Sequence, residues 1–534
     1  MVYTNGAEYS LSPNSINLSN FSEFGNWFGQ AFGKLVEKLK IKFPILGSVP
    51  EMPFLSSLRA LEITDCCAIK SLQEVMEQST RLDRLVIEGC DTLMSVAEGQ
   101  LPSSLKTLEI RSCTNMRHLF VDGEANINGS LLEYLYVSQC PALQFLSLTD
   151  QLPEALQHLQ IEHCSQLETI GQLPETLKHL VIKRLDRLSS AGHLPASLEH
   201  LSICECPITT LSSTGHLPAS LQKLKIVNCS ELTSLSLTGH LPASLQKLKI
   251  VNCSELTSLS STGHLPASLQ RLKIESCSNL TSLSSGQLLP ATLKYLNISN
   301  CGISSIADGL QNLSNLQQIN IFNCPSLKSF PQGGLPRTCL TVFSIRSCKD
   351  LVSLPSSMHT LNSLQEMHIE DLPSLSSFPQ NGLPINLTSL SIKDLKIQDQ
   401  VMQLLMQQLH KLTSLRNLSI GGCQNVVCFP QKGKEMRLPT SLTRLTLENF
   451  SKLERLSLEC FRNLASLECL AISWCPKLTS FLKKDLPSSL LELYISNCSK
   501  LTNRCGNGGR YWSNISNIPY VEIDGKYIHE PPPV

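Results

Sequence analysis

The sequence predicts an α/β repeat protein, a solenoid of about 19 short coils whose parallel strands form one β-sheet along a concave face. Three observations predict this fold. A frame with leucine at its first position, apolar residues at its fourth and sixth, and usually cysteine at its ninth recurs along the chain. Successive frames are on average 24 residues apart. Long helices that alternate with strands are absent, which disfavours a doubly wound enzyme fold.

The frame occurs 19 times and begins at Leu58, Leu82, Leu105, Leu132, Leu156, Leu177, Leu198, Leu221, Leu245, Leu269, Leu293, Leu316, Leu340, Leu364, Leu387, Leu415, Leu442, Leu467 and Leu490. Its period falls within the window of about 20–29 residues that is typical of leucine-rich repeats. The predicted shape is therefore a curved horseshoe.

The alternation within each frame predicts a short strand. In Leu108-Glu109-Ile110 the two apolar residues share one face of the strand, and the residue between them faces outward. One such strand cannot bury its apolar side alone, so copies must stack in parallel. The Leu-Pro pair before many strands, such as Leu101-Pro102, favours extended backbone, and its proline lies ahead of the sheet because it lacks an N–H.

Cysteine fills the ninth frame position in 15 repeats, whereas Leu185, Leu372, Leu395 and Phe450 replace it in four. The chain has 22 cysteines, and no C-x2-C pair occurs. Since leucine and phenylalanine substitute for it, we interpret the cysteine as a small buried side chain at the end of each strand. A ladder of disulfides or zinc sites is the alternative.

Composition and charge limit the possible classes of protein. Lys+Arg and Asp+Glu are both 44, so the formal charge is zero, and 42% of the residues are hydrophobic. The chain is too apolar for a disordered protein and too balanced for one that coats nucleic acid. No apolar run is long enough to span a membrane, and the first residues do not read as a secretion signal. These features predict a cytoplasmic protein.

Three segments are predicted. Residues 1–54 would form a polar N-terminal segment that includes a helix over residues 22–39. Residues 55–501 would form the solenoid. Residues 502–534 would form a C-terminal cap with one more strand, followed by a tail. Apolar residues from Phe24 to Leu39 recur at helical spacing. This helix would cap the open end of the solenoid; a helix that docks on a membrane surface or a partner is the alternative.

Some coils are longer or duplicated. Residues 399–410 read as an amphipathic helix on the convex side, and the insertion with Lys432 and Lys434 reads as a surface loop. Residues 215–238 and 239–262 differ only at Leu237 and Ser261, and 263–286 are a close third copy. Such duplication is compatible with a solenoid, because each coil contacts only its neighbours.

The coil L-P-S-S-L-K-T-L-E-I-R-S-C and the ending Tyr511-Trp512…Ile518-Pro519…Val521-Glu-Ile-Asp-Gly525 resemble plant disease-resistance proteins of the nucleotide-binding, leucine-rich-repeat, coiled-coil class. The resemblance covers about residues 55–525. The sequence contains no G-x4-G-K-[ST] phosphate loop, so the nucleotide switch of that class is not carried over. The chain would be a repeat-only relative, a truncated gene product or half of a split receptor.

The resemblance implies a non-catalytic recognition module in plant defence that binds a pathogen effector or a guarded host protein through its concave face. A nucleotide-binding module in trans is a further possible partner. The alternatives are a substrate adaptor of a ubiquitin ligase, or a truncated remnant that does not signal. No G-x-S-x-G or H-E-x-x-H motif occurs, so no enzyme activity, cofactor or metal is predicted.

The outward positions of the strands supply the candidate binding residues, which are Tyr134, Tyr136, His158, His179, His200, Lys223, Lys225, Lys247, Lys249, Arg271, Lys273 and Tyr295.

Over repeats five to ten, the outward positions carry seven permanent positive charges against two negative ones. This basic strip would attract an acidic partner. Alternatively, repeat duplication copied one Lys-x-Lys strand with no function. A metal at the three histidines is less favoured. Nucleic acid is disfavoured as a ligand, because few aromatics interleave with the lysines. Phe322 and Tyr494 are further candidate anchors.

Overall fold

The computed structural model describes residues 15–18, 38–42, 55–97, 101–121, 130–236, 240–260, 264–283, 288–306, 308–355, 357–376, 378, 382–395, 408–423, 425–429, 437–456, 461, 463–479, 486–505 and 509–528. The chain divides into two compact units, Met1–Thr262 and Gly263–Val534, here called the N-terminal and C-terminal units. The predicted helix at 399–410 lies mostly outside the described residues, as do the loop at Lys432 and Lys434 and the tail after residue 528.

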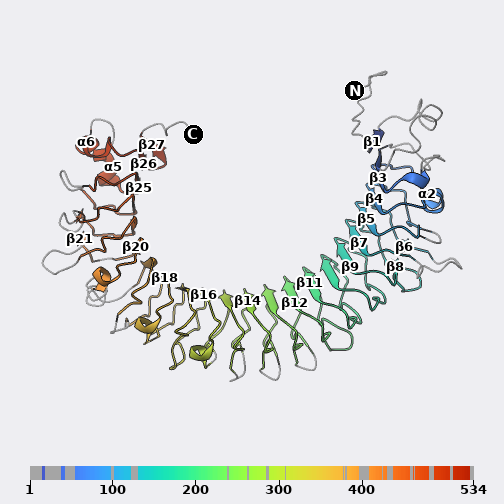
Figure 1. Cartoon of the computed structure of the whole chain (residues 1–534), viewed down its shortest axis with the longest axis horizontal. Coiled ribbons are helices and arrows are strands. Elements are labelled where there is room, and N and C mark those ends of the chain that lie inside the picture. The colour runs from blue at the N-terminus through green and yellow to red at the C-terminus, as the bar shows by residue number, and fades with distance from the viewer. Residues whose placement is uncertain are drawn as a thin grey trace, which may run out of the picture. The chain divides into compact units, whose positions relative to one another are not determined.

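Parallel strands in successive coils build one sheet through the N-terminal unit (Figure 1). These strands are β1 (Ser15–Leu18), β2 (Lys38–Ile41), β3 (Ala60–Thr64), β4 (Arg84–Glu88), β5 (Thr107–Arg111), β7 (Tyr134–Ser138), β9 (His158–Glu162), β10 (His179–Lys183), β11 (His200–Cys204), β12 (Lys223–Val227) and β13 (Lys247–Val251). A second, small parallel sheet joins β6 (His118–Phe120) and β8 (Phe145–Ser147). The helices are η1 (Leu55–Ser57) and α2 (Gln73–Gln78).

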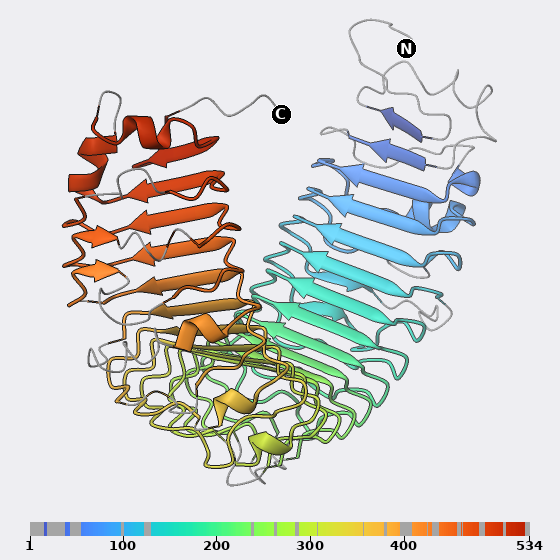
Figure 2. The ribbon, with the colours of Figure 1, turned by 60° about the vertical axis from the view of Figure 1, so that its left-hand side comes forward.

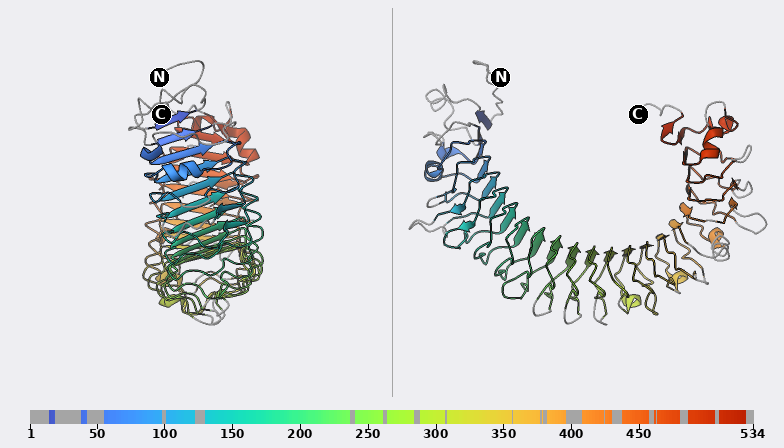
Figure 3. Two further views of the ribbon diagram at one scale, coloured as in Figure 1. Left: turned by 90° about the vertical axis from the view of Figure 1, so that its right-hand side faces the viewer. Right: turned by 180° about the vertical axis from the view of Figure 1, so that it is seen from behind.

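The C-terminal unit repeats this arrangement (Figure 2). Its main strands are β14 (Arg271–Glu275), β15 (Tyr295–Ser299), β16 (Gln318–Phe322), β17 (Val342–Arg346), β18 (Glu366–Glu370), β19 (Ser389–Lys393), β20 (Asn417–Gly421), β22 (Arg444–Glu448), β24 (Cys469–Ser473), β25 (Glu492–Ser496), β26 (Tyr520–Ile523) and the antiparallel β27 (Lys526–Tyr527). A small sheet joins β21 (Cys428–Phe429) and β23 (Arg455–Leu456). Its helices are η3 (Leu310–Asn312), η4 (Met358–Thr360), η5 (Leu409–Lys411), α5 (Ser499–Cys505) and α6 (Trp512–Ile515). Helices η3, η4 and η5 lie on the side of the coils away from the main strands (Figure 3).

The predicted solenoid with a parallel sheet is confirmed. Each of the 19 frames contains a strand that starts two residues after its first leucine. In β12 the apolar Leu224 and Ile226 are buried, whereas Lys223, Lys225 and Val227 are partly exposed. We call the side that carries the first, third and fifth residues of each strand the sheet face. It corresponds to the surface that the sequence predicts to be concave.

The N-terminal expectation needs a correction. Residues 19–37 lie outside the described part of the chain, but Leu39, the last residue of the predicted helix, lies in β2 and pairs with Leu61 of β3. Residues 15–18 also form a strand, β1. The pattern Val36-x-x-Leu39-x-Ile41 is a degenerate frame in which valine replaces the first leucine. The expected extra strand near the C-terminus is present as β26.

The ninth-position thiols point inward, as predicted. All 15 are buried, and most of them donate a weak hydrogen bond to the carbonyl two residues earlier, such as Cys113 Sγ to Arg111 O at 3.4 Å. The residue between donor and acceptor has left-handed backbone in every repeat; Asn228, for example, has φ of 55°. This conformation turns the chain off the strand, and it explains the many Asn, Asp, Ser and Gly residues at the eighth position.

The burial of these thiols makes them poor nucleophiles. Burial raises the pKa of Cys229 to about 11 and that of Cys324 to about 12. Cys67, in contrast, is exposed. Because the thiolate is the reactive form, a thiol reagent at pH 8 is expected to modify Cys67 rapidly and Cys229 only when the coil unfolds. Peptide mass spectrometry over time measures both rates, Cys67→Ser is the control, and equal rates for the two peptides would contradict the prediction.

Candidate functional site

Nine of the twelve candidate residues lie on the sheet face of the N-terminal unit, where the strand register places them in columns. The first strand positions pair in the order Tyr134, His158, His179, His200, Lys223 and Lys247. The third positions hold Tyr136, Gln160, Val181, Ser202, Lys225 and Lys249. The other three candidates, Arg271, Lys273 and Tyr295, lie on the sheet face of the C-terminal unit. The register therefore matches the predicted columns within each unit.

The three histidines form a stacked column. The rings of His158 and His179 are 4.3 Å apart and nearly parallel, at 11°. The rings of His179 and His200 are 4.2 Å apart and meet edge to face, at 79°. Tyr134 continues the column, with its ring centroid 6.1 Å from that of His158. These contacts make the column a continuous surface of flat rings, and each ring is only partly exposed.

This packing disfavours a positive charge on His179 and His200. Burial and the neighbouring His200 and His158 lower the pKa of His179 to about 4. Burial, with Lys223 second, also lowers the pKa of His200. At neutral pH His179 and His200 are therefore uncharged, and their rings form a polar, aromatic surface beside the lysines.

The lowered pKa predicts how the column responds to acid. The unfolded chain protonates this histidine near pH 6.5 and the folded chain near pH 4, so the unfolded state binds more protons between these values. The contribution of His179 to stability is thus complete above about pH 6.5 and falls as the pH drops toward 4. As the pH is lowered, NMR titration of the histidine ring protons is expected to show His179 protonating last. The His179→Gln variant assigns its signal. A midpoint near pH 6.5 for that signal would contradict the prediction.

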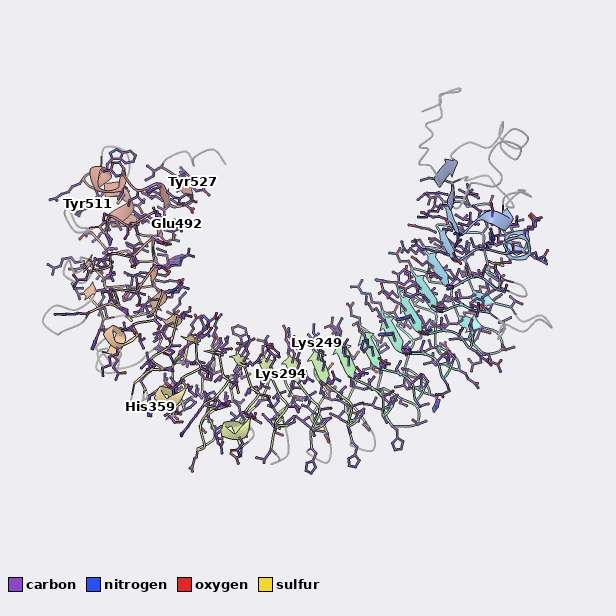
Figure 4. The ribbon with its side chains drawn as sticks, in the orientation of Figure 1. Lys249, Lys294, His359, Glu492, Tyr511 and Tyr527 are labelled. Carbon is purple, nitrogen blue, oxygen red and sulfur yellow. The ribbon has the colours of Figure 1, made fainter. Side chains whose placement is uncertain are left out.

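Four lysines form the most strongly charged part of the sheet face. Lys223 pairs in register with Lys247, and Lys225 with Lys249, so neighbouring charges stem from strands about 4.8 Å apart. We call these four residues the lysine quartet. Figure 4 shows Lys249 on the strand side of the coils. Among the described residues, no carboxylate lies within ion-pair distance of any member of the quartet.

Two other lysines of the predicted strip are paired, which leaves its predicted net charge unchanged but shows where that charge lies. Lys183 of β10 forms an ion pair with Glu162 of β9, and Gln160 donates a 2.8 Å hydrogen bond to the same carboxylate. In the C-terminal unit, Lys273 lies 2.9 Å from Glu275. The two acidic residues of the predicted strip therefore each neutralise a lysine. Among the described strands β9 to β13, the positive charge that lies outside ion pairs is that of the quartet.

Sequence reasoning missed a charge network near the start of the same face. Glu109 of β5 is almost buried and accepts hydrogen bonds from Arg84 at 2.6 Å and from Arg111 at 2.5 Å. The Arg111 guanidinium also lies over the ring of Tyr136, 5.3 Å from its centroid. The signal was present, because Arg84, Glu109 and Arg111 occupy outward positions of two neighbouring strands. Tyr136 is therefore an anchor held by an internal cation, not a free ring.

The remaining candidate aromatics lie in the C-terminal unit. Arg271 lies over Tyr295, 4.3 Å from the ring centroid. Phe322 is 46% exposed at the end of β16. Tyr494 contacts Tyr520, with ring centroids 5.4 Å apart. Phe322 is thus the exposed ring of this set, and within the described part of the chain no other ring or cation packs against it.

No helix that the structure describes has the length and apolar composition needed to cross a lipid bilayer. Within the described ranges, no three or more His, Cys, Asp or Glu side chains gather in a way that would hold a metal ion.

Comparisons with known proteins agree with the repeat and its fold. No protein-family model matches the chain. Part of it, 198 residues or 37% of the chain, is 39% identical to a predicted disease resistance protein of Arabidopsis thaliana, and the match spans 13% of the length of that protein.

Solved structures with similar folds include YopM of Yersinia enterocolitica, with 21% identity, a TM-score of 0.46 and coverage of 86% of this chain and 87% of that one. A leucine-rich-repeat protein of Leptospira interrogans has 18% identity, a TM-score of 0.43 and coverage of 85% and 99%. From its repeat frame, its parallel coils and its plant relative, the chain is a leucine-rich-repeat protein whose repeats resemble those of plant disease resistance proteins.

Proposed function

We propose that the sheet face of the N-terminal unit is a non-catalytic protein-binding surface that takes an acidic segment of a partner in plant defence. The partner would be a pathogen effector or a guarded host protein. The observation that carries the proposal is the lysine quartet, four cations on two neighbouring strands without an acidic partner among the described residues. The relative's description as a disease resistance protein supports the biological context.

The quartet is suited to attract a partner. Two unit charges about 5 Å apart in water repel by only about 0.8 kcal/mol, so a stable fold tolerates the quartet without using it. The unneutralised charge leaves a positive potential above β12 and β13, which speeds the approach of an acidic surface and is screened by salt beyond about 10 Å. The quartet would therefore contribute mainly to the association rate and to partner selection.

The surface beside the quartet offers contacts of another kind. The stacked rings of His158, His179 and His200 and the ring of Tyr134 form a strip of flat rings in the same column as Lys223. Aromatic side chains with restricted rotamers are favourable anchors in protein interfaces. An acidic segment lying across the strands would place carboxylates on the lysines and apolar groups on the rings.

The buried thiols bear on location. No disulfide bond joins the cysteines that the structure describes, and most of them are packed inside the coils. Such a core is suited to a reducing compartment, and we therefore include a cytoplasmic location in the proposal.

Charge reversal tests the proposed surface. Changing Lys225 and Lys249 to Glu is expected to slow association with an acidic partner at least tenfold and to flatten the salt dependence of the rate. Affinity capture from infected and healthy plant tissue identifies the partners, and stopped-flow or surface binding then measures the rates. The matched control is Lys106→Glu with Lys178→Glu, which reverses two exposed lysines outside the strands of the same unit.

Two results would contradict the proposal. One is capture of the same partners, in equal yield, by the wild type and the Lys225→Glu/Lys249→Glu variant. The other is specific recovery of cullin-complex subunits, which would favour a substrate adaptor of a ubiquitin ligase.

A further inference from the structure

The last strands of the C-terminal unit carry a cluster of three tyrosines. The ring centroids of Tyr494 and Tyr520 are 5.4 Å apart, and those of Tyr520 and Tyr527 are 5.2 Å apart. Tyr520 and Tyr527 meet edge to face, at 72°, and Tyr527 is 58% exposed. The three rings, which we call the tyrosine cluster, thus form a contiguous aromatic patch that solvent reaches.

The strand register shows which charges share the face of this cluster. Tyr520 and Glu522 are two residues apart on β26, and Tyr527 pairs directly with Glu522, so all three side chains lie on the same face. Lys526 pairs with the buried Ile523 and therefore belongs to the other face. Between β25 and β26, Tyr494 pairs with Glu522. Glu492 likewise pairs with Tyr520, so two carboxylates lie among the rings on this part of the sheet face.

These carboxylates are held at the ring edges. The Tyr520 hydroxyl donates to Glu522 at 3.2 Å, and the Tyr494 hydroxyl donates to Glu492 at 3.5 Å. A neighbouring cation, Arg444, approaches Glu492 only to 3.7 Å, and both side chains are substantially exposed. Such an exposed pair is readily replaced by another cation. Among the described ion pairs, none includes Glu522.

We propose that the tyrosine cluster, with Glu492 and Glu522, binds an arginine- or lysine-bearing segment of a partner protein. The faces of the rings attract a cation, and the carboxylates at their edges accept its N–H groups. Figure 4 shows Glu492 and Tyr527 on the strand side of this unit, whereas Tyr511 lies away from the strands.

The same chain already joins arginine to tyrosine twice at outward strand positions. Arg271 lies over Tyr295 at 4.3 Å, and Arg111 lies over Tyr136 at 5.3 Å. At the tyrosine cluster, no such internal guanidinium covers a ring in the described part of the structure. The patch therefore has the chemistry of these two contacts but lacks their cation. The proposal differs from the lysine quartet in its residues and in the charge of its ligand, so the two can fail separately.

Binding of short labelled peptides by the full chain tests the site. A fluorescein-labelled peptide of alternating glycine and arginine is expected to bind, a lysine version to bind more weakly, and a glutamate version not to bind. Tyr520→Leu with Tyr527→Leu is expected to weaken arginine-peptide binding at least tenfold, and Glu492→Gln with Glu522→Gln at least threefold. Fluorescence anisotropy at several salt concentrations measures these affinities.

Control variants separate a binding effect from loss of the fold. The Tyr520→Phe/Tyr527→Phe variant keeps the rings, so its affinity for the arginine peptide should be within threefold of the wild type. Phe322→Leu removes an exposed ring elsewhere in the unit and should leave this affinity unchanged. Thermal unfolding checks each variant. Wild-type affinity of the leucine variant, or equal binding of arginine and glutamate peptides, would overturn the proposal. Self-association that needs both Tyr520 and the lysine quartet would also overturn it, because a second copy would then be the occupant.

Discussion

Replacing Leu224 by alanine is expected to lower the free energy of unfolding by about 3 kcal/mol. Leu224 of β12 is 1% exposed, and its strand register places it between Leu201 and Leu248 in the core of the coils. Truncation removes buried apolar surface and leaves a cavity, because neighbouring coils are held by their own hydrogen bonds and cannot collapse into it. Urea unfolding followed by circular dichroism measures the loss.

The neighbouring residue provides a matched control. Lys225 is adjacent in sequence but lies on the sheet face, so Lys225→Ala is expected to change the free energy of unfolding by less than about 0.5 kcal/mol. Because coils contact mainly their neighbours, the leucine variant is also expected to lose hydrogen-exchange protection first in β11, β12 and β13. Equal stability losses for the two variants would contradict the assignment of buried and exposed positions.

The repeat frame predicted the strands well, because the fold repeats one local rule. Burial of the two apolar residues in each frame fixes which face is inside, and a shift by one residue would expose both of them. The frame was less informative at the ends. The frame of β2 is degenerate because valine replaces its first leucine, and the apolar residues that precede it recur at helical spacing. End coils have a neighbour on one side only, so their sequences are under weaker constraint from stacking.

The sequence predicted which candidate residues share a column, but not which of their charges are paired. The columns follow from the register, since each outward position faces its counterpart in the next coil. Ion pairing depends instead on how far a long side chain reaches toward a neighbouring strand. Lys183 reaches back to Glu162, whereas Lys225 and Lys249 form no ion pair with any carboxylate in the described ranges. Local sequence shows the charges of one repeat, and only the stacked coils show which of them are neutralised.

Replacing Glu109 by alanine is expected to destabilise the chain by about 2 kcal/mol. The side chain of Glu109 is 10% exposed, and two guanidiniums, those of Arg84 and Arg111, converge on its carboxylate. Loss of a buried partner commonly costs about 3–5 kcal/mol, but these arginines are about half exposed and can regain water, which reduces the penalty. The expected loss is therefore smaller than for Leu224.

A double-mutant cycle distinguishes this electrostatic effect from simple loss of packing. If the charge network stabilises the chain, Arg84→Ala should cost much less in the Glu109→Ala background than in the wild type, and the difference should shrink in 1 M salt, where charges are screened beyond about 3 Å. If the losses in the free energy of unfolding are additive and do not change with salt, the effect is due to packing alone. Since the Arg111 guanidinium also covers Tyr136, the Glu109→Ala variant should in addition free that ring on the sheet face, and quenching of tyrosine fluorescence by iodide would report its new exposure.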